Sequence, residues 1–171
     1  QLRRSTSSVK FQQSRNNQQP AIHLHIYPRK EMISIGITGI IGSGKSMLSQ
    51  VFRSMDIPVY DADTRAKELM NNNFAIRIIL KLEFGEETYR NDKINKEYLR
   101  KIVFGDEKNR QIINSIVHPA VKNDFIAWRE KTGAKIVAIE SAIIFDAKLE
   151  DILDKIIFVE AAEDILVKRI C

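Results

Sequence analysis

The sequence has few of the residues that build disulfide-rich or metal-bound scaffolds, with one cysteine and three histidines among 171 residues. The single cysteine, Cys171, excludes a disulfide framework within the chain and fits a reducing compartment, so we predict a cytoplasmic protein. No segment approaches the ~20 apolar residues that a membrane-spanning helix requires. Because two histidines, His23 and His25, lie in a polar N-terminal stretch, nothing local indicates a histidine metal site.

Acidic residues are missing from the first 30 positions, which hold six basic residues. This leaves 21 of the 27 basic residues against all 22 acidic ones, so the net charge of +5 does not indicate a nucleic-acid surface on the rest of the chain. We interpret residues 1–31 as a disordered basic tail, because they are rich in Gln, Ser, Asn and Arg and lack a hydrophobic period. The tail is similar in composition to an organellar transit peptide. The alternative is an upstream extension without function, with Met32 as the natural start.

A phosphate-binding loop is predicted after the apolar residues 32–37, where residues 39–46 fit the pattern G-x-x-x-x-G-K-[ST]. A strand that ends in such a turn and continues into a helix directs several backbone N–H groups to one point, at the positive end of the helix. Lys45 would reach the outer phosphates of ATP, and the Ser46 hydroxyl can ligate Mg²⁺. The predicted ATP-binding residues are Gly39, Ile40, Ile41, Gly42, Ser43, Gly44, Lys45, Ser46 and Met47.

Two carboxylates, Asp61 and Asp63, end the next apolar segment, which starts at Ile57. In an open parallel sheet the carboxyl ends of the strands line the ligand crevice, so these acids should face the same cavity as the phosphate loop. Both are therefore candidates for catalysis. Alternatively, Asp63 is the N-cap of a helix over residues 64–71, and one residue could serve in both ways.

The middle of the chain, about residues 68–130, is predicted to be a helical insertion between two strands. His118 and Pro119 would open a helix with proline at its first position. Val121, Phe125 and Trp128 recur at helical spacing, which favours a place for Trp128 in the core over a base-stacking platform.

Two further apolar segments predict the strands 135–139, ending at Glu140, and 155–159, ending at Glu160. Continuous apolar strands separated by helices belong to a parallel sheet that is covered on both faces. The predicted fold is therefore an α/β, doubly wound parallel sheet of the P-loop kinase type over residues 32–171. Residues 164–171 are helical in pattern.

Four motifs, in their order and spacing, resemble the dephospho-CoA kinases, which use ATP to phosphorylate the 3′-hydroxyl of dephospho-CoA. The phosphate loop resembles the family's T-G-G-I-G-S-G-K-S, residues 59–63 its I-D-A-D, His118-Pro119 its H-P, and residues 142–146 its P-L-L-F-E. The resemblance covers about residues 32–171. It implies ATP, Mg²⁺ and dephospho-CoA as ligands, and neither a nucleic-acid nor a membrane partner.

The resemblance also implies roles for single residues. Asp63 would take the proton of the acceptor hydroxyl, Asp61 would support it or the water shell of the metal, and Lys45 would hold the phosphates. His118 and Lys67 would bind the acceptor, although Lys67 stands where the family has arginine and loses the bidentate fork. Three further departures are Ile40 for the second loop glycine and Ala142 and Asp146 for the Pro and Glu of the third motif.

Family members continue into an arginine-bearing lid, a fifth strand and an adenine-contacting loop. Arg169 is the last basic residue near the start of the lid, so we expect the final strand and most of the lid to be missing. The 171-residue chain should then bind phosphate but be a poor enzyme, and it should be poorly soluble or self-associate because the strand 156–159 is uncovered. The alternatives are another P-loop nucleotide or small-molecule kinase, or a nucleotide-binding module without transfer chemistry. A switch of the latter kind would be expected to show an N-K-x-D loop, which is absent here.

Overall fold

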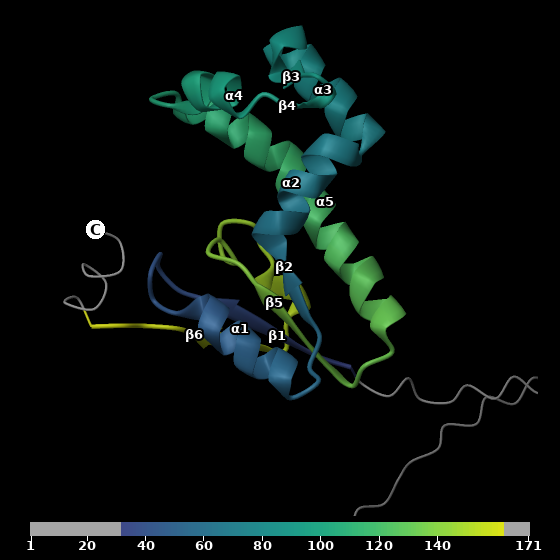
Figure 1. The fold of residues 1–171 in the computed structure, drawn as a ribbon, viewed down its shortest axis with the longest axis vertical. Coiled ribbons are helices and arrows are strands. Elements are labelled where there is room, and N and C mark those ends of the chain that lie inside the picture. Colours follow the sequence, from purple (N-terminus) through teal and green to yellow (C-terminus); the bar gives the residue numbers. More distant parts are fainter. Residues whose placement is uncertain (1–31, 163–171) are drawn as a thin grey trace, which may run out of the picture.

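A four-stranded parallel sheet forms the base of the computed structural model, which describes residues 32–162. Its strands lie in the order β2, β5, β1, β6 (Figure 1). They are β1 (Ile33–Thr38), β2 (Val59–Asp61), β5 (Ile136–Glu140) and β6 (Lys155–Phe158). All of their pairings are parallel, and Gly36 of β1 lies opposite Ile139 of β5 on one side and opposite Ile156 of β6 on the other. The predicted parallel α/β sheet is confirmed.

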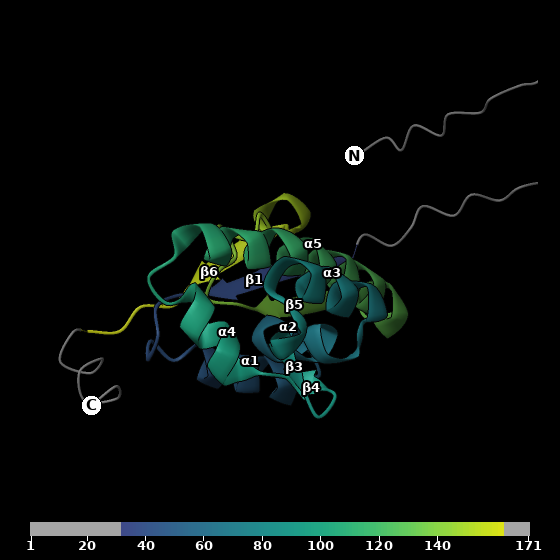
Figure 2. The same cartoon turned by 90° about the horizontal axis from the view of Figure 1, so that it is seen from above.

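Helices cover both faces of this sheet (Figure 2). Helix α1 (Lys45–Ser54) follows the glycine-rich loop and packs on one face, and α5 (Glu107–Thr132) packs on the other. The main core lies between α5 and the sheet, where Val121 and Phe125 meet Val137 and Ile139. Trp128 packs against the same core, with its ring 5.3 Å from that of Tyr60, so its predicted place on the buried stripe is confirmed.

The helical insertion extends beyond the carboxyl ends of the strands (Figure 1). It consists of α2 (Ala62–Asn72), α3 (Phe74–Phe84), α4 (Lys96–Val103) and the first half of α5, with a small core of its own around Leu80. It also contains an unpredicted hairpin of β3 (Tyr89–Arg90) and β4 (Lys93–Ile94), preceded by the 3-10 turn Glu86–Thr88. A second 3-10 turn, Glu150–Ile152, precedes β6.

The hairpin turns at Asn91 and Asp92, which both have positive φ angles, of 51° and 59°. Asparagine and aspartate tolerate this conformation, and two such residues in succession suit a tight two-residue hairpin turn. The residue types at the turn are thus typical of a hairpin. The strands on either side have two residues each, which is too short for the alternation of apolar and polar residues that predicts a strand.

Pro119 lies inside α5 rather than at the start of a helix, so the predicted helix start at His118 is wrong. Proline in a helix interior removes one backbone hydrogen bond, here the one to the Ser115 carbonyl, at a cost of roughly 3 kcal/mol. Val117 and Val121, on either side, are both buried against the sheet. Packing of this face keeps the helix continuous despite the lost bond.

Strand β6 pairs with β1 and with no other strand among residues 32–162. Phe158, at its end, is 53% exposed. The predicted tail over residues 1–31, the helical pattern over 164–171 and the lid residue Arg169 lie outside the described residues. Within residues 32–162, no helix combines the length and the apolar character needed to cross a membrane.

Candidate nucleotide and acceptor site

The glycine-rich loop between β1 and α1 has a backbone that only glycine adopts easily. Gly39, Gly42 and Gly44 have φ angles of 147°, 82° and 105°. A Cβ atom on Gly39 would lie 2.2 Å from the carbonyl oxygen of Val159, which is too close for any side chain to fit without a movement of the backbone. The loop borders a cavity of about 300 Å³ lined by Gly42, Gly44, Lys45, Ser46 and Met47. This shape suits the approach of a phosphate to backbone N–H groups at the start of α1.

Lys45 holds the two sides of this loop together. Its Nζ atom donates hydrogen bonds to the carbonyl oxygens of Gly39 and Ile40, each over 2.9 Å. The ammonium group therefore sits at the loop itself, with its charge close to where a phosphate would bind. Ile40, which replaces a family glycine, takes part through its carbonyl oxygen, while its side chain is exposed.

Ser46 connects the loop to the end of β5. Its hydroxyl donates a hydrogen bond to Oε1 of Glu140 over 2.8 Å. Glu140 in turn lies opposite Asp61 in the register of β5 and β2. Glu140 was not predicted as a site residue, although its position at the carboxyl end of a strand, like those of the two aspartates, could have indicated it.

Asp61 is the N-cap of α2, so the alternative interpretation of Asp63 as the cap of this helix is wrong. Its carboxylate accepts hydrogen bonds from the backbone N–H of Thr64, over 3.0 Å, and from the Thr64 hydroxyl, over 2.8 Å. The helix starts at Ala62, two residues earlier than predicted, because Asp61 keeps an extended backbone and caps from there. Asp63 lies in the first turn and has no part in the cap.

Asp63 faces a small cavity of about 200 Å³ between α2, α5 and the segment after β5. The lining is mostly apolar and includes Ala66, Val117 and Ile143. Burial raises the pKa of the Asp63 carboxyl above its ordinary value, the negative charges of Asp61 and Glu140 act in the same direction, and Lys67 and Lys45 oppose them. A carboxylate with a raised pKa is a stronger base near neutral pH.

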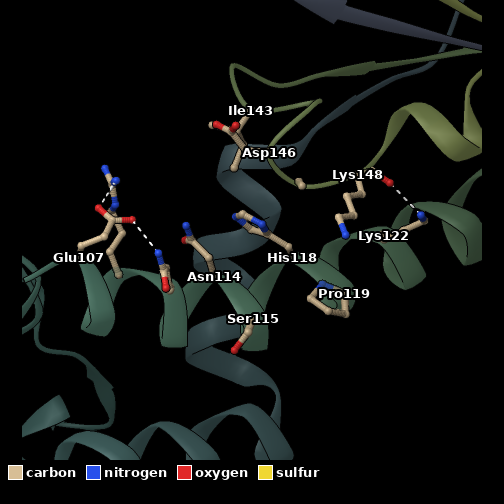
Figure 3. Close-up of a pocket in the computed structure, with 12 residues that line it drawn as sticks. Glu107, Asn114, Ser115, His118, Pro119, Lys122, Ile143, Asp146 and Lys148 are labelled. Atoms are coloured by element: carbon tan, nitrogen blue, oxygen red, sulfur yellow. Dashed lines mark hydrogen bonds and ion pairs between the residues drawn. The ribbon is translucent and has the colours of Figure 1, made fainter.

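A larger cavity of about 890 Å³ adjoins this small one (Figure 3). The two share His118, Asn114, Ile143 and Ala147 in their linings. The lining of the larger cavity includes three basic and two acidic residues. Its charged residues are Glu107, Arg110, Lys122, Asp146 and Lys148.

His118 is positioned on α5 where the two cavities meet. Burial lowers the pKa of its imidazole, while the charge and the backbone of Asp146 oppose that shift. The ring is therefore largely neutral at pH 7 and suited to hydrogen bonding rather than ion pairing. The structure brings the predicted residues Asp63 and His118 to one small cavity, whereas Lys67 lines neither cavity and acts on Asp63 through its charge.

The glycine-rich loop, the two acids and the histidine thus occupy one end of the sheet, and the comparison with known families agrees with their order. The family model described as dephospho-CoA kinase matches residues 33–171. The chain belongs to this family. The match includes the loop, the acidic turn at Asp61 and Asp63, and His118.

Dephospho-CoA kinases from two bacteria are similar to the chain over most of its length. The Porphyromonas gingivalis enzyme is 40% identical over 138 residues, which make up 81% of this chain and 68% of that enzyme. The Bacteroides fragilis enzyme is 37% identical over 138 residues, with coverages of 80% and 67%. The chain thus spans about two thirds of the length of these dephospho-CoA kinases.

Two solved structures are similar to the model in fold. A crystal structure from Thermus thermophilus superposes with a TM-score of 0.71 and 30% identity, covering 82% of this chain and 71% of the other. The dephospho-CoA kinase of Campylobacter jejuni superposes with a TM-score of 0.54 over 79% of this chain and 94% of the other. At 15% identity, the second comparison concerns the fold alone.

Proposed function

We propose that this dephospho-CoA kinase transfers the γ-phosphoryl group of ATP to the 3′-hydroxyl of dephospho-CoA with Asp63 as the general base. The observation that carries the proposal is the place of Asp63. Asp63 lines the small cavity, which meets the larger cavity at His118. The charges of Lys45 and Glu140, beside the phosphate loop, also contribute to the pKa of the Asp63 carboxyl. A base between donor and acceptor sites is what phosphoryl transfer to a hydroxyl requires.

The transfer step moves one proton and one phosphoryl group. The acceptor hydroxyl oxygen forms a bond to the γ-phosphorus while its proton passes to the Asp63 carboxylate. The bond from the γ-phosphorus to the β,γ-bridging oxygen breaks, and ADP leaves with that oxygen. The backbone N–H groups of the loop and the Lys45 ammonium hold the phosphates and stabilise the charge that spreads over them.

Magnesium fits the residues near the loop. Oxygen donors are the ligands that Mg²⁺ prefers, and the Ser46 hydroxyl and Glu140 carboxylate lie 2.8 Å apart at the loop. No cluster of three or more histidine, cysteine or carboxylate residues able to hold a metal occurs within residues 32–162, and Mg²⁺ bound with ATP needs only one or two protein ligands. Ser46 would hold the ion, with Glu140 orienting that hydroxyl. When bound, Mg²⁺ would neutralise phosphate charge.

The larger cavity supports a role as the acceptor site. Dephospho-CoA carries a pyrophosphate, and the cavity offers the cations Arg110, Lys122 and Lys148. Arg110 is ion-paired with Glu107, and Lys122 donates hydrogen bonds to the Lys148 carbonyl over 2.7 Å and to Asp151 over 3.3 Å. We assign the pyrophosphate to these cations and the reacting ribose to the end of the cavity at His118. Acceptor binding by Lys67, a lid role for Arg169 and a cytoplasmic location stay predictions from the sequence.

An acceptor panel tests this function. The complete protein would be incubated with Mg²⁺ and ATP and either dephospho-CoA, a nucleoside monophosphate, shikimate or no acceptor. We expect ADP formation above the acceptor-free rate with dephospho-CoA alone, and a new phosphorus resonance coupled to the ribose 3′-proton of the product. Equal ADP formation with and without dephospho-CoA, or a higher rate with another acceptor, would contradict the proposal.

A further inference from the structure

The turn that carries Asp61 and Asp63 is tied on both sides to one carboxylate of α5, that of Asp124. On the strand side, the Tyr60 hydroxyl donates a hydrogen bond to Oδ2 of Asp124 over 2.6 Å. On the helix side, Arg65 donates from Nε to Oδ2 over 3.0 Å and from Nη2 to Oδ1 over 2.9 Å. Tyr60 directly precedes Asp61, and Arg65 follows Asp63 by two positions. The acidic turn therefore lies between the two anchors.

The cluster of Tyr60, Arg65 and Asp124 runs from the core to the surface, because Tyr60 is buried whereas the side chains of Arg65 and Asp124 are 39% and 23% exposed. Tyr60 is 2% exposed, and its ring meets the edges of Phe125 and Trp128, with 5.3 Å between ring centres in each pair. The fork of Arg65 meets the carboxylate through two parallel bonds, which fix direction as well as distance. Such a geometrically specific contact, anchored in the core through Tyr60, sets the separation of the elements that it joins.

All members of the cluster keep the required protonation state at neutral pH. Burial raises the pKa of the Tyr60 hydroxyl, and the hydrogen bond to Asp124 adds to that shift, so Tyr60 stays a donor. Burial alone would raise the pKa of Asp124, but the hydrogen bonds from Arg65 and Tyr60 outweigh it and leave the pKa below its ordinary value. Asp124 therefore stays an ionised acceptor for both partners.

Helices α2 and α5, which the cluster joins, form the walls of the cavity that Asp63 and His118 share. We propose that Asp124 is a positioning residue for phosphoryl transfer, which holds Tyr60 and Arg65 so that Asp63 keeps its place relative to an acceptor bound beside His118. The inference rests on the proposed role of Asp63 as the base. Since a misplacement of about 1 Å in an active site can cost ~100-fold in rate, losing either anchor should reduce turnover.

The test compares variants of the cluster with matched variants elsewhere in the complete protein. Asp124→Asn, Tyr60→Phe and Arg65→Met each remove part of the cluster. Tyr98→Phe removes a tyrosine bond of 2.7 Å to the Phe84 carbonyl, and Lys81→Met removes the ion pair with Glu86. The readouts are kcat, KM for ATP and for dephospho-CoA, the pH profile of kcat/KM, and thermal unfolding.

We expect the cluster variants to lower kcat by up to ~100-fold while KM for ATP stays unchanged, because the phosphate loop is not part of the cluster. The acid limb of their pH profiles should move, since the surroundings of Asp63 change. The double variant of Tyr60→Phe and Arg65→Met should lose less than the product of the two single losses, because both act through the same carboxylate. The Tyr98 and Lys81 controls should keep the kcat of the wild type.

A purely structural role predicts a different pattern, in which thermal stability falls but kcat and the pH profile of the folded enzyme do not change. That result would overturn the inference. If Asp124→Asn fails to fold, Tyr60→Phe and Arg65→Met decide, because each leaves the charge of Asp124 in place. Asp63→Asn separates this inference from the proposed function. If Asp63→Asn is inactive while all cluster variants are fully active, the positioning role of Asp124 is refuted and the proposed function stands. If Asp63→Asn is active, both are refuted.

Discussion

The Ser46 hydroxyl and the Glu140 carboxylate, 94 positions apart in the chain, are joined by a hydrogen bond of 2.8 Å. This bond connects the start of α1 to the carboxyl end of β5. It places one acidic side chain directly against the hydroxyl that would ligate Mg²⁺. In the proposed mechanism, Glu140 would orient the Ser46 hydroxyl through this bond.

Glu140→Gln should weaken the use of Mg²⁺ without unfolding the protein. Glutamine keeps an oxygen that accepts from Ser46 but loses the negative charge. Since residues that orient metal ligands typically contribute 10–100-fold to metal affinity, we expect the Mg²⁺ concentration for half-maximal activity to rise by about 10-fold or more. The measurement is turnover against Mg²⁺ at fixed ATP, with Glu97→Gln on the exposed start of α4 as the control. An unchanged Mg²⁺ requirement would separate Glu140 from the metal.

Asp61→Ala should destabilise the protein by about 1 kcal/mol, because it removes the N-cap of α2. Asp61→Asn should keep most of this stability, since asparagine caps equally well. The Asn variant should also move the acid limb of kcat/KM to lower pH, because the negative charge of Asp61 raises the pKa of Asp63. Chemical denaturation and pH profiles of both variants check this, and equal stability of the two would contradict the capping role.

Gly39→Ala should abolish nucleotide binding. The new Cβ atom would lie 2.2 Å from the Val159 carbonyl oxygen, so the loop or the end of β6 must move. Gly105→Ala is the matched control, because Gly105 also has a positive φ, of 83°, but nothing lies within 4 Å of the added Cβ. Gly105→Ala should lose about 1 kcal/mol of stability from backbone strain, and Gly39→Ala should lose more because of the clash with Val159. Calorimetric titration with ATP should distinguish them, and equal ATP affinity in both would show that the close approach to Val159 has no role in binding.

The raised pKa of Asp63 gives a signed prediction for stability. The Asp63 carboxyl binds its proton more tightly in the folded protein than in the unfolded chain. Protonation of Asp63 therefore adds to the free energy of unfolding, fully below the ordinary pKa of 3.8, and this contribution is lost as pH rises through the raised pKa. Ionised Asp63 therefore costs stability at neutral pH. Asp63→Asn should unfold at a higher denaturant concentration than the wild type at pH 7, and this advantage should shrink toward pH 3. A less stable variant at pH 7 would contradict the raised pKa of Asp63.

The phosphate loop and the parallel sheet were predictable because their determinants are local. Gly39 and Lys45 fall in one short motif, and the apolar strands can be recognised from a few consecutive residues. Pro119 was assigned to a helix start on local preference, but packing of its neighbours on the sheet keeps it inside α5. The place of Glu140 at the end of a strand could be recognised from the sequence. Its bond to Ser46, 94 positions away, and the bonds of Asp124 to residues 59 and 64 positions away are made only by the tertiary structure.

The cap of α2 shows the same limit at short range. Asp61 and Asp63 are both good N-cap residues, and their spacing does not distinguish them. The pairing of Asp61 with Glu140 holds Asp61 in an extended backbone, which decides that the helix starts immediately after it. Asp63 is thereby left free of the cap and directed to the cavity.

The rate of phosphoryl transfer by Asp63→Asn, at saturating ATP and dephospho-CoA, tests the central claim most directly. Asparagine has nearly the size and shape of aspartate but is a poor base. We predict that kcat falls by the ~10²–10⁴-fold typical of a lost general base, while ATP affinity and folding are retained. A kcat equal to that of the wild type would show that Asp63 does not accept the proton and would contradict the mechanism.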